Sequence, residues 1–577
     1  MSMTAPSYRS TLITYLAPQK ARVSLLTLAL FGSIGLQLVV PLILRRFIDS
    51  AVAGGAVSVL VAAGVAYLIA GVVNQVLNAV STYLGADVGW IATNRLREDL
   101  ARHLLSLDMG FHNDRTPGEM IERVDGDVTA IANFLSRFMV RLLGSAFLLV
   151  GVLAVAWAED WRMGLAISLY IAMFLVLVIR MRDFAIRASE IERETSARFY
   201  GFIEERLAGI DDIRANGAGA FTMRRFVGVM RDYFFRTVAA WRKRILFWVT
   251  TNVVSWSGDI LALSVGVWLN LRGSITIGTA YLILQYTQLI RTPIEQVSQE
   301  FQELQKAAGG LIRTDALRDI RSRLDESGQA VLSQGPLSVE FDGVSFAYEQ
   351  RPVLREITFR LEPGTVLGLL GRTGGGKSTI TRLISRLYDP DRGVVTIGDV
   401  DVREVSKASL RRAVGVVTQD VQLFRASVRD NLTFFERTDD EEILAVLESA
   451  GLADWIRSIG LDTELGPAGE GLSAGEQQLL AFARVFLQDP SVVLLDEPSA
   501  RLDPATEAML AGATQRLFGG RTVVIIAHRL ETVRFADEIM VVQEGRIAEY
   551  GGRAQLEEDP ASIYSALLRT GSGAELA

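Results

Sequence analysis

The chain contains no cysteine and only three histidines, His103, His112 and His528. Without cysteine, disulfide bonds, thiolate catalysis and cysteine metal sites are excluded. A metal site with several histidine ligands is hard to build from so few residues. The net charge is −7 and no basic tract stands out, which argues against nucleic acid as a partner. The first apolar run is too long and begins too late for a cleavable signal peptide.

Long apolar runs fill the first half of the chain. Hydrophobic residues make up 49% of the 577 residues, and the mean hydropathy of +0.27 is too high for one large soluble enzyme. A membrane-spanning helix needs about 20 mostly apolar residues. Six segments meet this requirement, near 23–44, 57–83, 136–158, 161–181, 245–271 and 277–297. The connections at 51–57 and 158–161 are very short, so these spans are expected to form hairpins.

The charges between the spans predict their orientation, because arginine and lysine gather on the cytoplasmic side. The basic residues beside the spans are Lys20, Arg22, Arg95, Arg97, Arg102, Arg180, Arg182, Arg242, Lys243 and Arg244. The opposite loops hold few charges. Both termini and the second half of the chain are therefore expected in the cytoplasm, and the protein is expected to be a multi-pass protein of the inner or plasma membrane.

Two long stretches, 84–135 and 182–244, are charged and almost free of proline. We expect the membrane helices to continue through them far into the cytoplasm, because unstructured loops of this length are uncommon. Each stretch has one break, at His112–Gly118 and at Asn216–Ala220. Each break predicts a turn that contacts another domain; the alternative is a solvated loop.

Several polar residues lie within the predicted spans. Asp259 and Arg141 are charged, and a charge inside a membrane usually faces an interior or a cavity. Asp259 could contact a cationic substrate, couple to protons or pair with an arginine. Five amides could line a cavity or link helices, namely Asn74, Gln75, Asn78, Gln285 and Gln288. Pro41 and Pro293 are expected to kink their helices.

The second half begins after a polar segment that ends at Pro336, where strand-like alternation resumes at Leu337–Phe341. We therefore predict three parts: an all-α six-helix transmembrane domain over residues 1–320, a linker over 321–336, and an α/β nucleotide-binding domain over 337–577.

A phosphate-binding loop follows the buried strand predicted at Val366–Leu370. Residues 371–379 read GRTGGGKST and match G-x-x-x-x-G-K-[ST] between a strand and a helix. Glycines let the backbone wrap a phosphate chain, and successive N–H groups at the helix N-terminus attract anions. The predicted nucleotide contacts are Gly371, Arg372, Thr373, Gly374, Gly375, Gly376, Lys377, Ser378 and Thr379. Lys377 is expected at the β- and γ-phosphates, and Ser378 on Mg²⁺.

Two further apolar strands end in residues suited to phosphoryl chemistry. Val492–Asp496 is followed by Glu497, and Val523–Ile526 is followed by Ala527 and His528. Asp496 is expected to reach Mg²⁺, and Glu497 to polarise the attacking water. His528 could contact the γ-phosphate. Lys377, Glu497 and His528 are therefore the predicted catalytic residues.

The order and spacing of these motifs resemble an ATP-binding cassette transporter of the exporter-fold half-transporter type, and the resemblance covers nearly the whole chain. It implies that Tyr348 stacks on adenine, that Gln419 touches Mg²⁺, and that Leu472–Glu476 (LSAGE) is the signature motif. It also makes Ser499–Asp503 the following loop of the family. The two cytoplasmic breaks then resemble coupling helices.

The signature motif departs from the common L-S-G-G-Q at Ala474 and Glu476, whereas Ser473 and Gly475, expected at the γ-phosphate, are retained. The resemblance implies that ATP is held between the phosphate loop of one chain and the signature of another, so a second half-transporter is required. The off-pattern signature beside an intact Glu497 favours a heterodimer over a homodimer.

These observations predict ATP-driven export of a small amphipathic or lipid-like compound, with ATP and Mg²⁺ as cofactors. The partners are the second half-transporter, the transported molecule and the lipid bilayer, without nucleic acid. The alternatives are an importer on the same fold, for instance of a metal chelate, an ATP-gated channel or regulator, and a soluble cassette ATPase.

Overall fold

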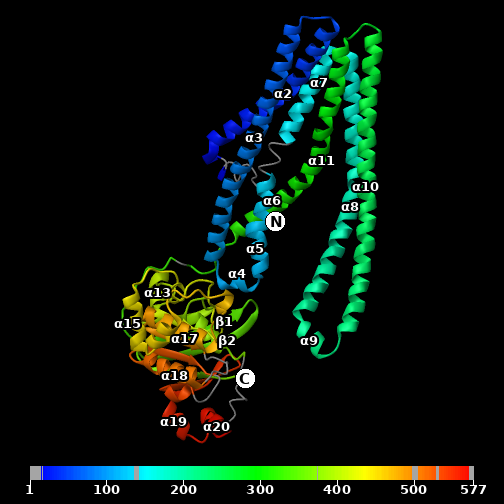
Figure 1. Ribbon diagram of the computed structural model, residues 1–577. Helices are drawn as coiled ribbons and strands as arrows, with labels where there is room; N and C mark the ends of the chain where they lie inside the picture. The colour runs from blue at the N-terminus through cyan, green and yellow to red at the C-terminus, as the bar shows by residue number, and fades with distance from the viewer. Residues whose placement is uncertain are drawn as a thin grey trace. The chain divides into compact units, whose positions relative to one another are not determined.

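The computed structural model describes residues 14–15, 17–134, 142–325, 327–372, 374–496, 504–527 and 532–570. The chain divides into two compact units (Figure 1). The first comprises Met1–Leu105 and Thr116–Ile320, and the second comprises Ser106–Arg115 and Arg321–Ala577. Several sequence-predicted residues lie outside the described residues, namely Arg141, Thr373, Glu497, the loop Ser499–Asp503 and His528.

The described part of the first unit is helical. Its elements are η1 (Ala17–Gln19), α2 (Lys20–Val52), α3 (Val57–Ser106), α5 (Pro117–Ile121), η2 (Glu122–Asp127), α6 (Val128–Asn133), α7 (Gly144–Glu159), α8 (Trp161–Ala208), α9 (Ile210–Ala215), α10 (Gly219–Leu271) and α11 (Ile277–Asp319). Asp160 alone separates α7 from α8, and its carboxylate caps α8 by accepting from the Arg162 N–H over 2.7 Å. The predicted hairpin at 158–161 is confirmed.

Helix length explains the long stretches between the spans. α3, α8 and α10 contain 50, 48 and 53 residues. At about 1.5 Å per residue each is about 70–80 Å long, whereas the hydrocarbon core of a bilayer is about 30 Å thick. α8 packs along α10, and α9 joins them. Gly217, with φ +65°, lies in the turn after α9, so the predicted break at Asn216–Ala220 is confirmed.

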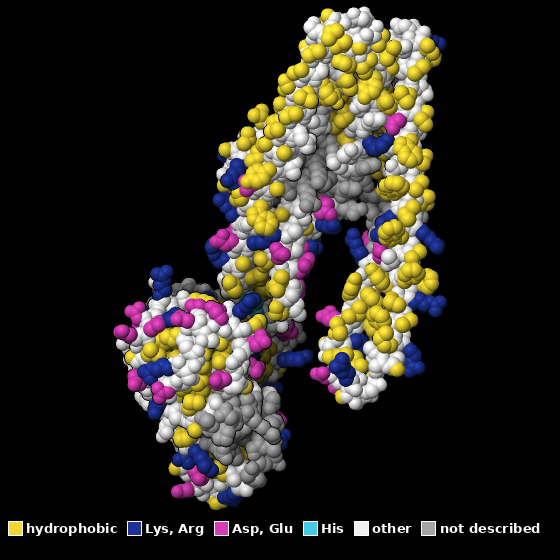
Figure 2. Space-filling view, viewed as in Figure 1, with side chains coloured by type: hydrophobic (Ala, Val, Ile, Leu, Met, Phe, Trp, Pro, Cys, Tyr) yellow, Lys and Arg dark blue, Asp and Glu magenta, His cyan; other side chains and the backbone are white. Residues whose placement is uncertain are grey.

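Four helical segments are long and apolar enough to cross a membrane, namely Ala17–Val52, Val57–Ser106, Trp161–Met181 and Gly219–Leu271. Figure 2 shows hydrophobic side chains on the outward surface of these helices. Gly144–Glu159 is a shorter apolar helix within the predicted span 136–158, part of which lies outside the described residues. The span predicted at 277–297 lies in α11, where polar residues lower the hydropathy, and it stays a prediction.

The second unit contains two β-sheets. The strands are β1 (Val339–Tyr348), β2 (Arg351–Leu361), β3 (Val366–Leu370), β4 (Arg392–Ile397), β5 (Val400–Asp401), β6 (Val414–Val417), β7 (Val492–Asp496), β8 (Thr522–Ile526), β9 (Glu538–Gln543) and β10 (Arg546–Gly552). One sheet is antiparallel, with the order β2-β1-β4-β5. The other has the order β10-β9-β3-β8-β7-β6, and its strands run parallel except β10.

Helices surround these sheets. They are α4 (Met109–Asn113), α12 (Lys377–Ile384), α13 (Lys407–Ala413), α14 (Val428–Thr433), α15 (Asp440–Ala450), α16 (Ala453–Ile459), η4 (Pro467–Gly469), α17 (Ala474–Gln488), α18 (Pro504–Phe518), η5 (Thr532–Phe535), α19 (Arg553–Glu558) and α20 (Ile563–Thr570). Alternate residues of the parallel strands β3, β7, β8 and β9 belong to two different hydrophobic cores. In β7, Val493 and Leu495 join the helices α14–α18, whereas Val492 and Leu494 join the antiparallel sheet and α12. The parallel sheet is therefore buried on both faces, as the apolar strand sequences predict.

Candidate nucleotide site

The phosphate-binding loop connects β3 to α12 and depends on its glycines. Gly371, Gly374 and Gly376 have φ of +142°, +82° and +108°, a region in which side chains are strained. A Cβ at Gly371 would lie 2.2 Å from the Val542 carbonyl oxygen, and one at Gly376 would lie 2.6 Å from a Leu354 methyl group. The backbone can therefore curl over the N-terminus of α12 only with glycine at these positions.

Lys377 places a buried cation under this loop. Its side chain is 5% exposed, and its ammonium group donates to the carbonyl oxygens of Gly371 and Arg372, the latter over 3.1 Å. Burial lowers the pKa of Lys377, although Asp496 opposes the shift. Burying a cation costs free energy unless it is paired, so an anion at this loop would be strongly stabilised.

The carboxyl ends of four neighbouring parallel strands meet at the same edge of the sheet. Gly371 follows β3, Ala527 follows β8, Asp496 ends β7, and Gln419 lies two residues after β6. The Ala527 N–H donates to the Leu369 carbonyl oxygen over 3.1 Å, which holds the end of β8 against β3. Ligands of open α/β sheets bind at this edge. The structure thus brings together predicted residues that are far apart in the sequence.

A magnesium ion would find oxygen donors at this edge. Asp496 offers a carboxylate, Gln419 an amide oxygen, and Ser378 a hydroxyl group on the first turn of α12. Mg²⁺ prefers oxygen ligands and is usually held by one or two protein groups together with phosphate and water. Within the described residues no cluster of three or more His, Asp or Glu side chains could hold a metal alone. The donor set therefore fits Mg²⁺ brought by a nucleotide.

Tyr348 ends β1 beside the phosphate-loop helix. Its hydroxyl group lies 3.4 Å from Thr379 Oγ1 and accepts from the Arg382 guanidinium over 3.0 Å. The ring contacts Phe346 and Tyr388 edge-on, with centroid distances of 4.9 and 5.2 Å. The side chain is only half-buried. The Tyr348 ring, which lies beside the phosphate-binding loop, can therefore stack on a nucleotide base.

The signature motif caps α17. The Ser473 hydroxyl group accepts from the Glu476 N–H over 3.3 Å, and the Glu476 carboxylate accepts from the Ser473 N–H over 2.8 Å. This reciprocal arrangement is a capping box. Gly475 is buried beneath it, and Ser473 is exposed. The off-pattern Glu476 is thus well accommodated, because its charge lies at a helix N-terminus.

Arg484, which belongs to none of the sequence motifs, links α17 to the segment after Gln419. Its guanidinium donates to the Gln422 carbonyl oxygen over 3.0 Å and to the Asn431 side chain over 3.2 Å, and it lies 4.6 Å from the centre of the Phe434 ring. Burial lowers its pKa to about 10. The signal in the sequence was a single arginine within an apolar helical segment.

The short helix α4 belongs to the same unit as the nucleotide site. Asp108 caps α4 by accepting from the Phe111 N–H over 3.1 Å, and its other oxygen accepts from the Arg323 N–H over 2.6 Å. Burial would raise the pKa of Asp108, but these hydrogen bonds outweigh it and lower the pKa. Asn113 at the end of α4 donates to the Tyr388 hydroxyl group over 2.6 Å. The predicted elbow at His112–Gly118 therefore contacts the aromatic residues beside Tyr348.

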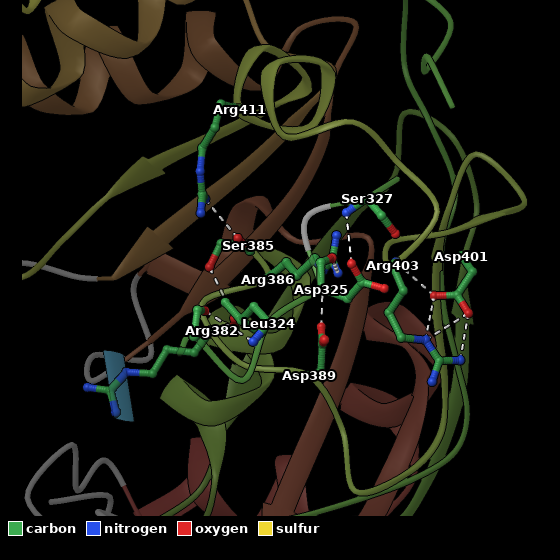
Figure 3. A network of polar contacts seen from close by, with 11 residues as sticks. Leu324, Asp325, Ser327, Arg382, Ser385, Arg386, Asp389, Asp401, Arg403 and Arg411 are labelled. Carbon is green, nitrogen blue, oxygen red and sulfur yellow. Dashed lines mark hydrogen bonds and ion pairs between the residues drawn. The ribbon is translucent and has the colours of Figure 1, made fainter. Parts of the chain in front are cut away.

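A polar network ties Asp325 to the end of α12 (Figure 3). Arg386 is 7% exposed; its guanidinium donates to the Asp325 carbonyl oxygen and to the Asp389 carboxylate, the latter over 3.1 Å. The Arg411 guanidinium donates to the Ser385 carbonyl oxygen over 2.8 Å. Further along, Ala330 forms a bridge with Val405. Hydrogen bonds thus hold the segment after Arg321 against the C-terminal end of α12.

Asp259 in α10 pairs with Arg291 in α11. The Arg291 guanidinium donates to one Asp259 oxygen over 3.1 Å, and the other oxygen is buried without a partner among the described residues. Of the three roles left open for Asp259, the structure shows the arginine pair. Of the five predicted cavity amides, Asn78, Gln285 and Gln288 line a cavity, whereas Asn74 accepts from the Ser33 hydroxyl group over 2.9 Å.

Comparisons with known proteins agree with this geometry. The family described as ABC transporter transmembrane region matches residues 23–294, and the family described as ABC transporter matches residues 354–500. YknV of Bacillus subtilis, an uncharacterized ABC transporter ATP-binding protein, is 28% identical over 97% of this chain and 93% of its own. A Staphylococcus aureus protein provisionally named a multidrug export ATP-binding/permease protein is 28% identical over 94% of this chain and 96% of its own.

A solved structure of a bacterial Atm1-family ABC exporter with ATP bound has a similar fold. The TM-score is 0.78 at 24% sequence identity, and the match covers 96% of this chain and 99% of that one.

Proposed function

The chain belongs to the ATP-binding cassette transporters of the exporter fold, and from that premise we propose that it is one half of a dimer that exports a small amphipathic compound. The observation that carries the proposal is Lys377. A buried ammonium group beneath a glycine loop, in a chain whose other half consists of long apolar helices, places a phosphate-binding site and a membrane domain in one polypeptide.

The residues of this chain have distinct roles in the proposed cycle. The loop Gly371–Thr379 and Lys377 bind the phosphates, and Tyr348 binds the adenine. Ser378, Gln419 and Asp496 would hold Mg²⁺, which would neutralise phosphate charge. Glu497 orients the attacking water and His528 contacts the γ-phosphate. The two nucleotide-binding domains of the dimer would alternate between an open and a closed arrangement. Nucleotide can drive this change only if it binds the closed arrangement more tightly than the open one.

A second chain completes each site. Ser473 and Gly475 of the signature lie at the N-terminus of α17, where N–H groups and the helix dipole favour an anion. We propose that they meet the nucleotide held by the phosphate loop of the partner. A heterodimer remains our preferred arrangement, and co-purification of a different half-transporter with the tagged chain is the test. Recovery of this chain alone as a dimer would favour a homodimer.

Glu497→Gln tests the function. In inside-out membrane vesicles the wild-type chain should hydrolyse ATP and accumulate substrate, and the variant should bind ATP but lose nearly all turnover at the site that this chain builds. Full residual hydrolysis at that site would refute the assigned role. ATP-dependent efflux from these vesicles would favour the importer alternative, whereas ATP-dependent ion currents would favour a channel.

A further inference from the structure

The first unit contains a cavity of about 930 Å³ bounded by α2, α3, α6, α7 and α11. We propose that this cavity binds an uncharged amphipathic molecule whose polar half carries several amide or hydroxyl groups. The inference rests on the proposed transport function and names the substrate class of that transporter.

The cavity wall is rich in neutral hydrogen-bonding groups. Six of its residues carry a side-chain amide: Gln37, Asn78, Asn133, Gln285, Gln288 and Gln296. Five more carry a hydroxyl group: Ser33, Thr82, Thr129, Ser145 and Thr292. No Asp or Glu is found among the described residues of this wall. A wall of this composition suits a ligand with many neutral donors and acceptors.

The polar groups form an ordered stripe on α11. The lining residues Gln285, Gln288, Thr292 and Gln296 recur at intervals of three or four, which is one face of a helix. The apolar residues Tyr286, Ile290 and Ile294 are fully buried in the helix bundle. α11 therefore directs its apolar face to the bundle core and its amide face to the cavity.

Several of these amides are available to a ligand. Among the described residues, the side chains of Asn78, Asn133 and Gln288 have no hydrogen-bond partner. An amide left unpaired in hydrocarbon costs several kcal/mol, so these groups require water or a polar ligand. By contrast, Gln285 donates to the Tyr281 hydroxyl group over 2.7 Å and Gln296 accepts from the Ser145 hydroxyl group over 3.0 Å.

The charged side chains on or near the cavity wall already have hydrogen-bond partners. The Arg97 guanidinium on the cavity wall donates to Asp125, Asn94 and Thr129 over 3.0, 2.9 and 2.8 Å. The Asp259 carboxylate is bonded to Arg291 and does not line the cavity. A lipophilic cation therefore finds no free carboxylate on the described wall, and a lipophilic anion finds its one guanidinium occupied.

Apolar residues complete the site. Leu30, Ile34, Leu148 and Leu289 line the cavity together with Trp90, whose side chain is largely exposed. They can contact the apolar half of an amphipath while the amides contact its polar half. This division resembles ordinary ligand pockets, in which a few placed polar groups give specificity.

Three probes with an apolar chain of nine or ten carbons test the substrate class, using full-length protein in lipid nanodiscs and probe concentrations below micelle formation. They are decanoyl-N-methylglucamide, decyltrimethylammonium and decyl sulfate. The uncharged glucamide should bind about tenfold more tightly than either charged probe, measured by ligand-induced thermal shift without ATP. It should also stimulate ATP hydrolysis most.

A single isosteric change should reverse the preference. Gln288→Glu places a carboxylate on the wall and should favour decyltrimethylammonium over the glucamide. Gln75→Glu is the matched control, because Gln75 is an exposed amide on α3 outside the cavity wall. The control should keep the wild-type preference.

The outcomes separate the two proposals. If the wild-type protein shows ATP-dependent transport in vesicles but binds the cationic probe as tightly as the glucamide, the substrate class is wrong and the transporter function stands. If Gln288→Glu leaves the preference unchanged, the cavity is not the site. Selective glucamide binding without ATP-dependent transport would uphold the cavity and overturn the proposed function.

Discussion

The side-chain amide of Asn113 donates a hydrogen bond to the Tyr388 hydroxyl group over 2.6 Å. The Tyr388 ring in turn meets the Tyr348 ring edge-on, with centroids 5.2 Å apart. Asn113 ends α4, the short helix that follows the long membrane helix α3. One amide and two rings thus connect the predicted adenine contact to the chain segment that leads into the membrane.

Tyr388→Phe removes the hydroxyl group and keeps the ring. We expect unchanged KM for ATP, because the packing on Tyr348 remains, and weaker stimulation of hydrolysis by substrate. The lost hydrogen bond is worth about 1 kcal/mol, or roughly fivefold in coupling. Stimulated and basal ATPase rates measure the effect. Tyr200→Phe, at an exposed tyrosine of α8, is the control. Equal stimulation in wild type and Tyr388→Phe would show that this contact transmits nothing.

Tyr348→Ala should raise KM for ATP with less effect on kcat, because stacking on the base is mainly ground-state binding. Base–aromatic stacking contributes about 1–3 kcal/mol, which corresponds to at least a fivefold rise in KM. Tyr348→Phe should retain most of the affinity. Steady-state ATPase kinetics decide the matter, and a variant in which only kcat falls would argue against adenine stacking.

The lowered pKa of Lys377 predicts that nucleotide binding depends on pH. Burial lowers its pKa below the ordinary 10.5. Between the lowered value and 10.5 the unfolded chain holds one more proton than the folded, nucleotide-free chain, so the stability of that form rises with pH. Bound phosphates favour the charged ammonium, so binding takes up protons and the affinity falls as pH rises through this window.

Calorimetry with a non-hydrolysable ATP analogue, in buffers of different ionisation enthalpy, measures this proton uptake. Lys377→Arg is the control, because arginine stays charged throughout the range. Binding enthalpies that do not depend on the buffer at alkaline pH would contradict a neutralised Lys377.

The Asp259–Arg291 pair should be structural. Asp259→Leu leaves a guanidinium unpaired between α10 and α11, and Arg291→Met leaves a carboxylate. Each change should cost less than the ~3–5 kcal/mol of a fully buried pair, because the side chains are 23% and 31% exposed. The double variant should recover most of the thermal stability in detergent. If the stability lost by the double variant equals the sum of the losses of the two single variants, the residues act independently.

The two residues of the capping box on α17 should contribute differently to the stability of the second unit. Ser473→Ala loses the side-chain cap of α17 and should destabilise the second unit by about 1 kcal/mol. Glu476→Gln should change stability by less than about 0.5 kcal/mol, because glutamine also completes a capping box. Thermal unfolding without nucleotide measures both. A larger loss for Glu476→Gln than for Ser473→Ala would contradict the capping geometry.

Local patterns were predicted well from the sequence. The strand expected at Val366–Leu370 is β3 and the one expected at Val492–Asp496 is β7, with the same bounds. Both are short apolar runs that end at motifs, so neighbouring residues suffice to define them. Parallel pairing of these strands then places their ends at one edge, which explains why the nucleotide site could be assembled from motifs.

Long-range partners could not be predicted in this way. Asn113 and Tyr388 are 275 residues apart; the break at His112–Gly118 predicted a contact, but nothing in the sequence identified Tyr388 as its partner. The partner of Asp259 was left open for the same reason. Asn74 and Asn78 share one face of α3, yet only Asn78 lines the cavity, whereas Asn74, one turn earlier, accepts from the Ser33 hydroxyl group. The position of the cavity along the helix depends on its neighbours and cannot be read from this spacing.

The contacts of Asp325 with Arg386 and of Ala330 with Val405 have a practical consequence for separating the two halves of the polypeptide. A cut before Arg321 would leave the ATPase half with both of these contacts, whereas a start at Leu337 would remove the Asp325 acceptor of the Arg386 guanidinium and leave Val405 without its neighbour Ala330. Cleavage by a protease, or division of the gene, should therefore be tolerated better before Arg321 than before Leu337.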